Sequence, residues 1–399
     1  MEVKALRAAL RALSVYRTLL DQPLMRQVTQ LLDHLSAERG EPALDAYTQL
    51  FYMLRESGNT SLGQWLDERL RYEEVPYSLL VEQGGRDAEL ERAARRDVET
   101  LCELAGLECS QCRSALKRLL GEEYGPVVEN LPGWPAEVPF SLEELNEGYR
   151  KHGTGRFARY RAFLWEQGRL LPVVDPDRGA EGEMMGYEPQ REEVISNTRA
   201  LVEGKTVNNV LLYGDSGTGK SATVKSLLQV KGFEDLRLIE IDKDDLAALP
   251  TLIRALRGRR QKFILFIDDL AFDRDDKTYS ALKTILEGGL EKRPENVAVY
   301  ATSNRRHLVR QTFSDRAGDE VDRKETIGEK TSLSERFGVR VAFLPLNKTD
   351  YLNLVDRMAQ QEGVTLEREA LHAQALTWEM YHPGRTPRTV RQFFDSLHR

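Results

Sequence analysis

The feature that constrains this chain most is the glycine-rich run GDSGTGKS at residues 214–221. It has the pattern GxxxxGK[ST], follows the strand-like run 208–213 and precedes the helical pattern 222–230. Glycines at this spacing let backbone N–H groups surround phosphate oxygens, and the N-terminus of the next helix adds partial positive charge. The sequence therefore predicts a strand, a phosphate-binding loop and a helix in succession, rather than a chance glycine-rich turn.

This loop supplies candidate ligands for a nucleoside triphosphate and its metal ion. Lys220 is expected to reach the β- and γ-phosphates, and the Ser221 hydroxyl is expected to hold Mg²⁺. The residues expected to surround the nucleotide are Gly214, Asp215, Ser216, Gly217, Thr218, Gly219, Lys220, Ser221 and Ala222.

Short apolar runs alternate with helical patterns in the second half of the chain. Nearly continuous apolar strands separated by helices are typical of a parallel sheet covered on both faces. Such sheets bind ligands beyond the C-terminal ends of their strands. The predicted fold class here is α/β. The strand-like runs are 207–213, 236–241, 263–267, 297–302 and 339–344, and the helical patterns between them are 221–230, 246–256 and 279–286.

Two carboxylates follow the apolar run 263–267. Asp268 and Asp269 stand at the end of this buried strand, where a charge is costly unless it meets a cation. Mg²⁺ bound through Asp268 supplies such a cation. Asp269 is then placed as the general base that polarises the attacking water. A capping role for Asp269 is the alternative, because Asp is common after strands.

Asn304 lies just beyond the next strand-like run, 297–302. A neutral amide at this strand end can hydrogen-bond both the γ-phosphate and the lytic water without adding charge. Taken by itself, Asn304 is an ordinary turn residue. Its expected place beside the ends of two other strands makes it a candidate for the site.

The chain divides into three predicted domains. Residues 1–170 read as successive helices with apolar residues at three- and four-residue steps, and residues 1–180 are expected to form an all-α N-terminal domain. The stretch 171–186 is rich in Pro, Gly and acid, which is typical of a linker. Residues 181–345 form the α/β nucleotide-binding domain, in which the charged stretch 311–331 is expected as an exposed loop. Residues 346–399 form a small C-terminal helical lid.

Charge and cysteine content limit the classes of protein to consider. Residues 1–190 carry a net charge of −9 and residues 191–399 carry +2, which gives −7 for the chain. The acidic front half argues against a nucleic-acid-binding arm there. Charged residues interrupt every long apolar stretch, and the chain start lacks a signal-peptide core, so a cytoplasmic protein without a membrane partner is expected.

The sparse cysteines suit a reducing compartment better than a disulfide framework. Cys109 and Cys112 form a CxxC, but no second CxxC or His pair accompanies them. Reduced structural thiols are therefore favoured over zinc or redox chemistry. The three cysteines are Cys102, Cys109 and Cys112.

Together these motifs resemble the AAA+ ATPase superfamily over residues 181–399. Lys220 looks like the Walker A lysine, Asp268 and Asp269 look like Walker B, and Asn304 looks like the sensor-1 asparagine. The resemblance implies an enzyme that binds ATP with Mg²⁺ and hydrolyses it to ADP and phosphate.

Two arginines gain expected roles from the same resemblance. The run LSERFG at 333–338 looks like the box that carries the arginine finger, here Arg336. In the run 384–391, Arg388 is similar in position to the sensor-2 arginine of the lid, with Arg391 as a rival. The resemblance implies a ring or helical homo-oligomer in which Arg336 completes a neighbour's site in trans. An ordinary surface ion pair is the alternative for Arg336.

A closer resemblance lies in the runs YATSNRRHLV and GDSGTGKSATVKSLL, which look like one bacterial AAA+ family without a settled role. Asp269 departs from the superfamily, which usually has Glu there. Its side chain is shorter by a methylene, so slow hydrolysis is expected. Residues 186–190 lie where such domains often begin to enclose the adenine.

Three functions remain open on the sequence. The first is a protein remodeller or assembly factor that recognises a protein client through residues 1–180. The second is a nucleic-acid-associated loader or initiator, suggested by SLSERFG and by basic clusters, although a solvated or intersubunit face explains those clusters better. The third is a nucleotide switch with rare turnover. The clusters are Arg254, Arg257, Arg259, Arg260 and Lys262, and then Arg305, Arg306 and Arg310.

Overall fold

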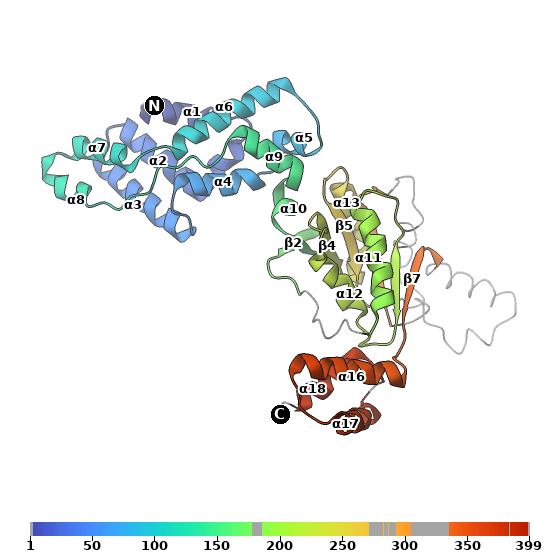
Figure 1. The fold of residues 1–399 in the computed structure, drawn as a ribbon. Coiled ribbons are helices and arrows are strands. Elements are labelled where there is room, and N and C mark those ends of the chain that lie inside the picture. Colours follow the sequence, from blue (N-terminus) through green and yellow to red (C-terminus); the bar gives the residue numbers. More distant parts are fainter. Residues whose placement is uncertain are drawn as a thin grey trace. The chain divides into compact units, whose positions relative to one another are not determined.

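The computed structural model describes residues 3–177, 186–270, 282, 286, 293–304, 335–382 and 384–397. It divides into two compact units, Met1–Arg159 and Tyr160–Arg399, each with its own hydrophobic core (Figure 1). The division therefore falls about twenty residues before the border expected near residue 180. The separation of residues 346–399 as a lid domain stays a prediction.

The first unit is helical, as expected. Its amphipathic helices begin at good caps: the side chains of Ser61, Asp87 and Ser141 each accept a backbone N–H in the first turn that follows. The helices are α1 (Val3–Arg11), α2 (Pro23–Ser36), α3 (Gly40–Glu56), α4 (Leu62–Tyr72), α5 (Pro76–Glu82), α6 (Ala88–Ala105), α7 (Cys109–Leu120), α8 (Gly125–Glu129), α9 (Leu142–His152) and α10 (Gly155–Arg159), with short 3-10 turns η1 (Arg17–Asp21) and η2 (Glu122–Tyr124).

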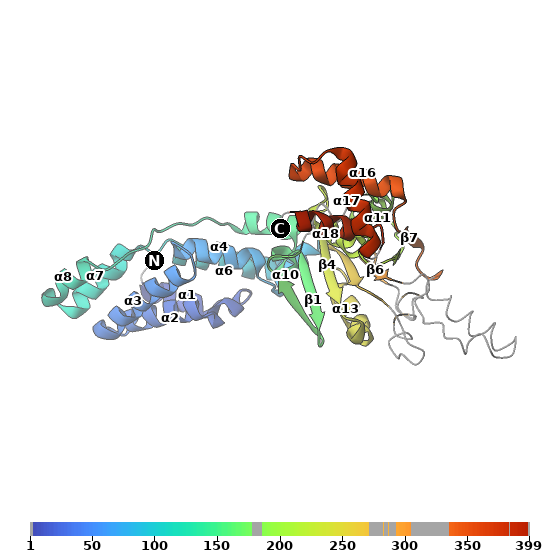
Figure 2. The same ribbon diagram turned by 90° about the horizontal axis from the view of Figure 1, so that it is seen from below.

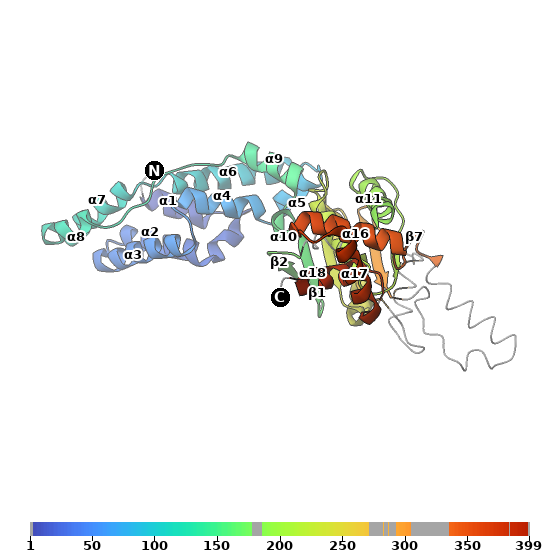
Figure 3. The same ribbon diagram turned by 60° about the horizontal axis from the view of Figure 1, so that its bottom comes forward.

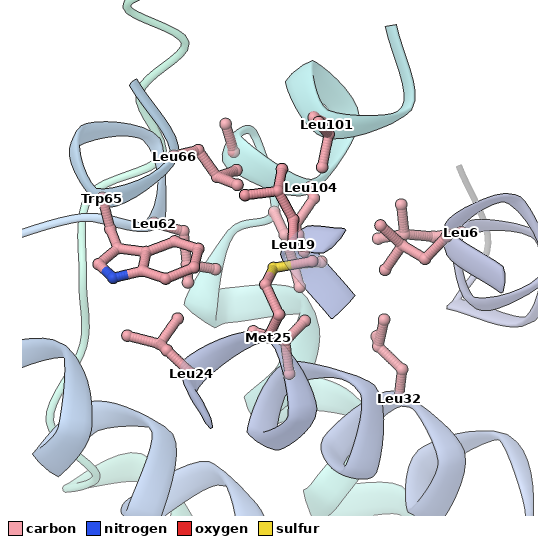
Figure 4. Packing of buried hydrophobic residues seen from close by; sticks show 14 of the residues in the cluster. Leu6, Leu19, Leu24, Met25, Leu32, Leu62, Trp65, Leu66, Leu101 and Leu104 are labelled. Carbon is pink, nitrogen blue, oxygen red and sulfur yellow. The ribbon is translucent and has the colours of Figure 1, made fainter. Parts of the chain in front are cut away.

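The core of this unit is built mainly from leucines. Side chains from α1, η1, α2, α4 and α6 point toward one another, and the labelled residues are almost completely buried (Figure 4). Burial of this apolar surface is what stabilises the short helices, because isolated helices of this length are marginal in water. The labelled residues are Leu6, Leu19, Leu24, Met25, Leu32, Leu62, Trp65, Leu66, Leu101 and Leu104.

One carboxylate is buried inside the helical unit. Asp97 of α6 is fully buried, and its Oδ2 accepts the backbone N–H groups of Ser14, Val15 and Tyr16 at 2.8, 2.7 and 3.2 Å. These three donors follow the end of α1, where helix partners are missing. Asp97 therefore satisfies a turn that would otherwise bury unpaired backbone groups.

The second unit contains a seven-stranded sheet with the strand order β2-β1-β4-β5-β6-β3-β7, and Figure 2 shows several of its strands. Every neighbouring pair is parallel except β1 and β2. The two central strands β5 and β6 are buried along nearly their whole length, so the sheet is covered on both faces and the predicted α/β class is confirmed. The strands are β1 (Ala162–Glu166), β2 (Arg169–Val173), β3 (Val210–Gly214), β4 (Leu236–Ile241), β5 (Lys262–Ile267), β6 (Val297–Ser303) and β7 (Val339–Phe343).

The hairpin β1–β2 differs from the expectation of helices up to about residue 170. β1 joins the sheet parallel to β4, with Leu164 opposite Glu240, and β2 forms the edge. The expected linker stretch from Leu171 overlaps β2. This segment therefore extends the sheet by two strands.

Helices connect the strands and continue after β7. The expected helix 221–230 is α12 (Lys220–Ser226) followed by a 3-10 turn, and the expected helix 246–256 is a 3-10 turn followed by α13 (Leu249–Leu256). Most of the expected helix 279–286, and the whole stretch 311–331, lie outside the described residues. The other helices are α11 (Glu188–Val202) before β3, and α16 (Lys348–Glu362), α17 (Arg368–Tyr381) and α18 (Pro387–Leu397), which contact one another after β7 (Figure 3). Across the described residues, no helix is both long and apolar enough to cross a bilayer.

Candidate functional site

The phosphate-binding loop, residues 214–221, connects β3 to α12, and its three glycines, Gly214, Gly217 and Gly219, all have positive φ. Gly214 has φ 140° and Gly217 has φ 79°, a region that residues with a Cβ rarely adopt. A Cβ on Gly214 would lie 2.0 Å from the Phe343 carbonyl oxygen, and one on Gly217 would lie 3.0 Å from Cβ of Arg388. The loop is therefore enclosed by β7 on one side and by the start of α18 on the other.

Lys220 begins α12 and points back into the loop. Its side chain is largely buried, and Nζ donates to the carbonyl oxygens of Gly214 at 2.8 Å and Asp215 at 2.7 Å, and to Oδ1 of Asn304 at 3.0 Å. Burial lowers the pKa of Lys220, while the nearby carboxylate of Asp215 acts in the opposite direction. The ammonium group is thus held between the loop and the end of β6, where an anion can reach it.

A hydroxyl and a carboxylate meet at the start of α12. Ser221 Oγ donates to Oδ1 of Asp268 at 2.6 Å, which joins the loop to the end of β5. Both groups offer oxygen donors, the type that Mg²⁺ prefers, and magnesium usually binds proteins through one or two carboxylates together with substrate phosphates. Ser221 and Asp268 therefore fit the metal ion that the sequence predicts.

The second carboxylate stands on an unusual backbone. Asp269 has φ 49°, in the left-handed region, and its N–H donates to Thr302 Oγ1 at 2.9 Å. Its Oδ1 accepts from Nδ2 of Asn304 at 2.8 Å. The Asn304 amide therefore joins Asp269 to Lys220, because its oxygen accepts from the lysine.

These groups surround a cavity of about 200 Å³. Three expected residues of the loop do not line it: the carbonyls of Gly214 and Asp215 hold Lys220, and Thr218 donates its hydroxyl to the Asp215 carbonyl at 2.8 Å. The cavity brings together strand ends that are far apart in the sequence, which is the position where parallel sheets bind ligands. Its lining is Ser216, Gly217, Gly219, Lys220, Ser221, Ala222, Asp268, Asp269, Thr302, Asn304 and Arg388.

The structure places Arg388 and Arg391 differently. Arg388, in the first turn of α18, lines the cavity, and its backbone N–H donates to the Gly217 carbonyl at 3.3 Å. Arg391 lies one turn further and pairs with Glu362 at 3.1 Å and with Asp395 at 3.6 Å. Of the two rivals, Arg388 is therefore the one beside the phosphate-binding loop.

Arg336 is not part of the cavity lining. It lies in a turn before β7 and is half-buried, and the next residue, Phe337, is fully buried and anchors this turn. Arg336 is therefore at a defined place in the fold without reaching the cavity of its own chain. The first two residues of the run 333–338 lie outside the described residues.

The structure describes only some residues of the basic clusters. Arg260 pairs with Asp235 at 3.0 Å, and Arg259 is buried. Arg305, Arg306 and Arg310 lie outside the described residues. In the first cluster, Arg260 is therefore in an ion pair within the protein and Arg259 is buried, so neither is a free surface charge.

The CxxC of the helical unit is buried in α7. Cys109 contacts the backbone of Trp134, and burial raises the pKa of Cys112 to about 12. All three cysteines are free thiols. In the described part of the chain, no three His, Cys, Asp or Glu side chains are grouped so that they could hold a metal ion.

Thr302 is the site residue that the sequence analysis did not single out. It lies at the penultimate position of β6, is buried, and lines the cavity. The available signal was a polar residue at the end of an apolar strand that points toward Walker B-like acids. That signal becomes specific only once the pairing of β5 with β6 is known.

Comparisons with known proteins give one family match and several remote likenesses. The model of a family described as "Protein of unknown function (DUF815)" matches residues 158–399, which is more than half of the chain. The match begins just before β1 and includes the whole sheet unit.

A curated relative is the chaperone protein ClpB of Pseudomonas putida, 26% identical over 161 residues. That match covers 36% of this chain and only 16% of ClpB. Among solved structures, the Thermotoga maritima RuvB Holliday junction branch migration motor is 18% identical with a TM-score of 0.36, and covers 54% of this chain and 62% of RuvB. A chain of the E. coli MS115-1 HORMA:CdnC:Trip13 complex is 12% identical with a TM-score of 0.37, and covers 55% and 92%.

Proposed function

We propose, from the premise that this chain belongs to the DUF815 family of proteins of unknown function, that it binds ATP with Mg²⁺ and hydrolyses it to ADP and phosphate. The chain is a P-loop protein of the AAA+ type, with a phosphate-binding loop between β3 and α12. The observation that supports hydrolysis best is the meeting of Lys220, Asp268, Asp269 and Asn304 around one cavity. A site for binding alone does not need a second carboxylate there.

In the proposed reaction, the triphosphate lies in the loop and Lys220 moves its hydrogen bonds from protein carbonyls to phosphate oxygens. Ser221 and Asp268 would hold Mg²⁺, which, when bound, neutralises charge on the phosphates and orients them. The γ-phosphorus forms a bond to a water oxygen and loses its bond to the β,γ-bridging oxygen. Asp269 accepts the proton of that water, and Asn304 orients the water beside it.

Two arginines complete the proposed site. Arg388 is proposed to contact the phosphates from the lid side, which is supported by its place in the cavity lining. Arg336 lies outside the cavity of its own chain, and we propose that it acts on a second copy in a homo-oligomer. An arginine supplied in this way stabilises the charge that develops on the γ-phosphoryl group.

Two substitutions test the proposal on the full chain. Lys220→Ala removes the cation that phosphate needs, so binding of a fluorescent ATP analogue should be lost. Asp269→Asn keeps the shape of the side chain and suits the left-handed backbone, because Asn tolerates that conformation. It should retain binding and lose hydrolysis by roughly 10²-fold to 10⁴-fold.

Matched controls are available on exposed residues of the same unit. Lys231→Ala and Asp175→Asn remove the same charges away from the cavity and should leave both readouts unchanged. Normal hydrolysis by Asp269→Asn would show that Asp269 is not the base. Normal binding by Lys220→Ala would exclude the loop as the phosphate site.

We further propose that the helical unit recognises a protein client and that the ATPase unit remodels or assembles it. The helical unit lies almost entirely outside the family match. The Asp269→Asn variant should capture the same proteins in repeated experiments when ATP is present and should not capture them without ATP. This result would support the proposed function. ATPase activity that rises with DNA or RNA, and loses that response with salt, would favour a nucleic-acid loader instead. ATP binding without turnover would favour a switch.

A further inference from the structure

A buried threonine hydroxyl contacts the carboxylate of one acidic residue of the candidate site and the backbone N–H of the next. Thr302, at the end of β6, is 1% exposed. Its Oγ1 donates to Oδ1 of Asp268 and accepts the backbone N–H of Asp269 at 2.9 Å. One hydroxyl therefore contacts both acids that follow β5, through its hydrogen on one side and its lone pair on the other.

Asp269 needs such a contact because its backbone is strained. A left-handed φ is uncommon for residues with a Cβ, and it persists where the surrounding structure holds it. The Asp269 N–H also reaches Oδ1 of Asp268 at 3.1 Å. The backbone N–H of Asp269 thus donates both to the end of β6 and to the preceding carboxylate, which fixes the backbone there.

The next residue extends this connection between the ends of β5 and β6. The N–H of Leu270 donates to the Thr302 carbonyl at 2.7 Å, and Ser303 Oγ donates to the Leu270 carbonyl at 2.8 Å. These bonds hold the turn after β5 against the last two residues of β6. The hydroxyl of Thr302 is the part of this connection that touches the acids themselves.

We propose that Thr302 is a positioning residue that gives the two adjacent carboxylates different directions. Its donated hydrogen holds Asp268 where Ser221 Oγ also donates, on the metal side of the cavity. Its oxygen accepts the N–H of Asp269 and so holds the Asp269 backbone in the left-handed form. This backbone directs the Asp269 side chain to Asn304. The inference rests on the proposed hydrolysis, because a positioned base matters only for an attacking water.

Thr302→Val is the direct test, because valine keeps the branched shape and lacks the hydroxyl. We expect kcat for ATP to fall about 10-fold to 100-fold, the size of effect that a small misplacement of a catalytic group produces. The KM for ATP should change less than about threefold, since Thr302 does not touch the phosphate-binding lysine. Thr302→Ser keeps the hydroxyl and should restore kcat to within about threefold of wild type.

A second readout does not depend on catalysis. Hydrogen exchange of the peptide amides at 268–270 in the nucleotide-free protein should be faster in Thr302→Val, because Asp269 N–H loses an acceptor. In Thr302→Ser the exchange should match wild type. Thr302→Ala provides the same loss of hydroxyl with less side chain, should valine not fit.

Thr198→Val is the matched control. Thr198 is a fully buried threonine of the same unit, and its hydroxyl contacts Val194 and Tyr300 away from the cavity. Loss of the Thr198 hydroxyl should lower the stability of the protein and leave kcat for ATP unchanged.

If the wild-type chain hydrolyses ATP, and Thr302→Val changes neither kcat nor the exchange at 268–270, this inference alone is overturned. A serine variant that is as impaired as the valine variant would also overturn it. A wild-type chain that hydrolyses no ATP would contradict the proposed function, and exchange at 268–270 would still decide whether Thr302 holds the Asp269 backbone.

Discussion

Buried polar groups serve different purposes in the helical unit and in the sheet unit. In the helical unit, the Asp97 carboxylate accepts hydrogen bonds from three backbone N–H groups. The Glu82 carboxylate accepts from the N–H of Thr154 at 2.9 Å and from the Thr154 hydroxyl at 2.7 Å. In the sheet unit, Lys220 and Thr302 are as deeply buried but line a cavity. A buried polar residue therefore indicates a functional site only where it also lines a cavity that a ligand can enter.

The largest expected effect concerns Arg336 and would extend the site beyond one chain. Arg336→Ala should lower hydrolysis by roughly 10³-fold or more if it stabilises the transition state on a neighbouring copy. A mixture of Arg336→Ala and Asp269→Asn should regain activity, because some interfaces then combine an intact base with an intact arginine. Phosphate release at several mixing ratios measures this. Two inactive variants that stay inactive when mixed would rule out action in trans.

The comparison predicts that removal of Asp97 changes stability and not chemistry. Asp97→Ala leaves the N–H groups of Ser14, Val15 and Tyr16 without their buried acceptor, which should cost about 3 kcal/mol. Denaturant unfolding followed by circular dichroism gives the stability, and ATP binding should be unchanged. Glu99→Ala, an exposed acid on the same helix, is the control. A variant of Asp97 that folds normally but fails to hydrolyse ATP would break the distinction between the units.

Arg388 and Arg391, both in α18, form a natural pair for a smaller expected effect. Arg388→Ala should weaken ATP binding or turnover about 10-fold, because its side chain faces the cavity and charge-assisted contacts to phosphate are strong. Arg391→Ala removes an exposed pair with Glu362 and should change stability by less than about 1 kcal/mol. Titration of both variants with an ATP analogue distinguishes them. Equal losses of ATP affinity in the two variants would mean that lining the cavity does not make Arg388 the arginine that contacts ATP.

Substitutions at two glycines can distinguish the effect of backbone strain from the effect of a steric clash at the site. Gly217→Ala and Gly232→Ala both place a Cβ on a left-handed backbone, so each should lose about 1 kcal/mol of stability. The new Cβ meets Arg388 at Gly217, whereas at Gly232 it meets no heavy atom within 4 Å apart from its chain neighbours. ATP affinity should therefore fall a few-fold for Gly217→Ala alone. A matching loss for Gly232→Ala would attribute the effect to strain.

That Lys220, Asp268 and Asn304 meet around one cavity could be predicted from the sequence, because their motifs lie at strand ends. Lys220, Asp268 and Asn304 each follow or flank an apolar run, and a parallel sheet necessarily brings such ends to one edge. The role of Thr302 could not be predicted in the same way. It depends on the register between β5 and β6 and on the left-handed φ of Asp269, and neither property is visible in residue types.

The hairpin β1–β2 was missed for a local reason. Its two-residue turn is Gln167–Gly168, and both residues have positive φ, as a type I′ turn requires. Sequences for this turn usually read Asn-Gly or Asp-Gly, so Gln-Gly gave no signal. The strands are also only five residues long, which is too short for a clear alternating pattern.

The most direct test of the account is a single-turnover measurement with the full chain in excess over ATP and Mg²⁺ present. This measures conversion of bound ATP to ADP and does not depend on product release. If Asp269 is the base, the wild-type chain should convert its bound ATP, while Asp269→Asn should retain ATP unchanged over the same time. Equal conversion by the two proteins, or bound ATP that persists in both, would contradict the assignment of Asp269 as the base of an ATP-hydrolysing site.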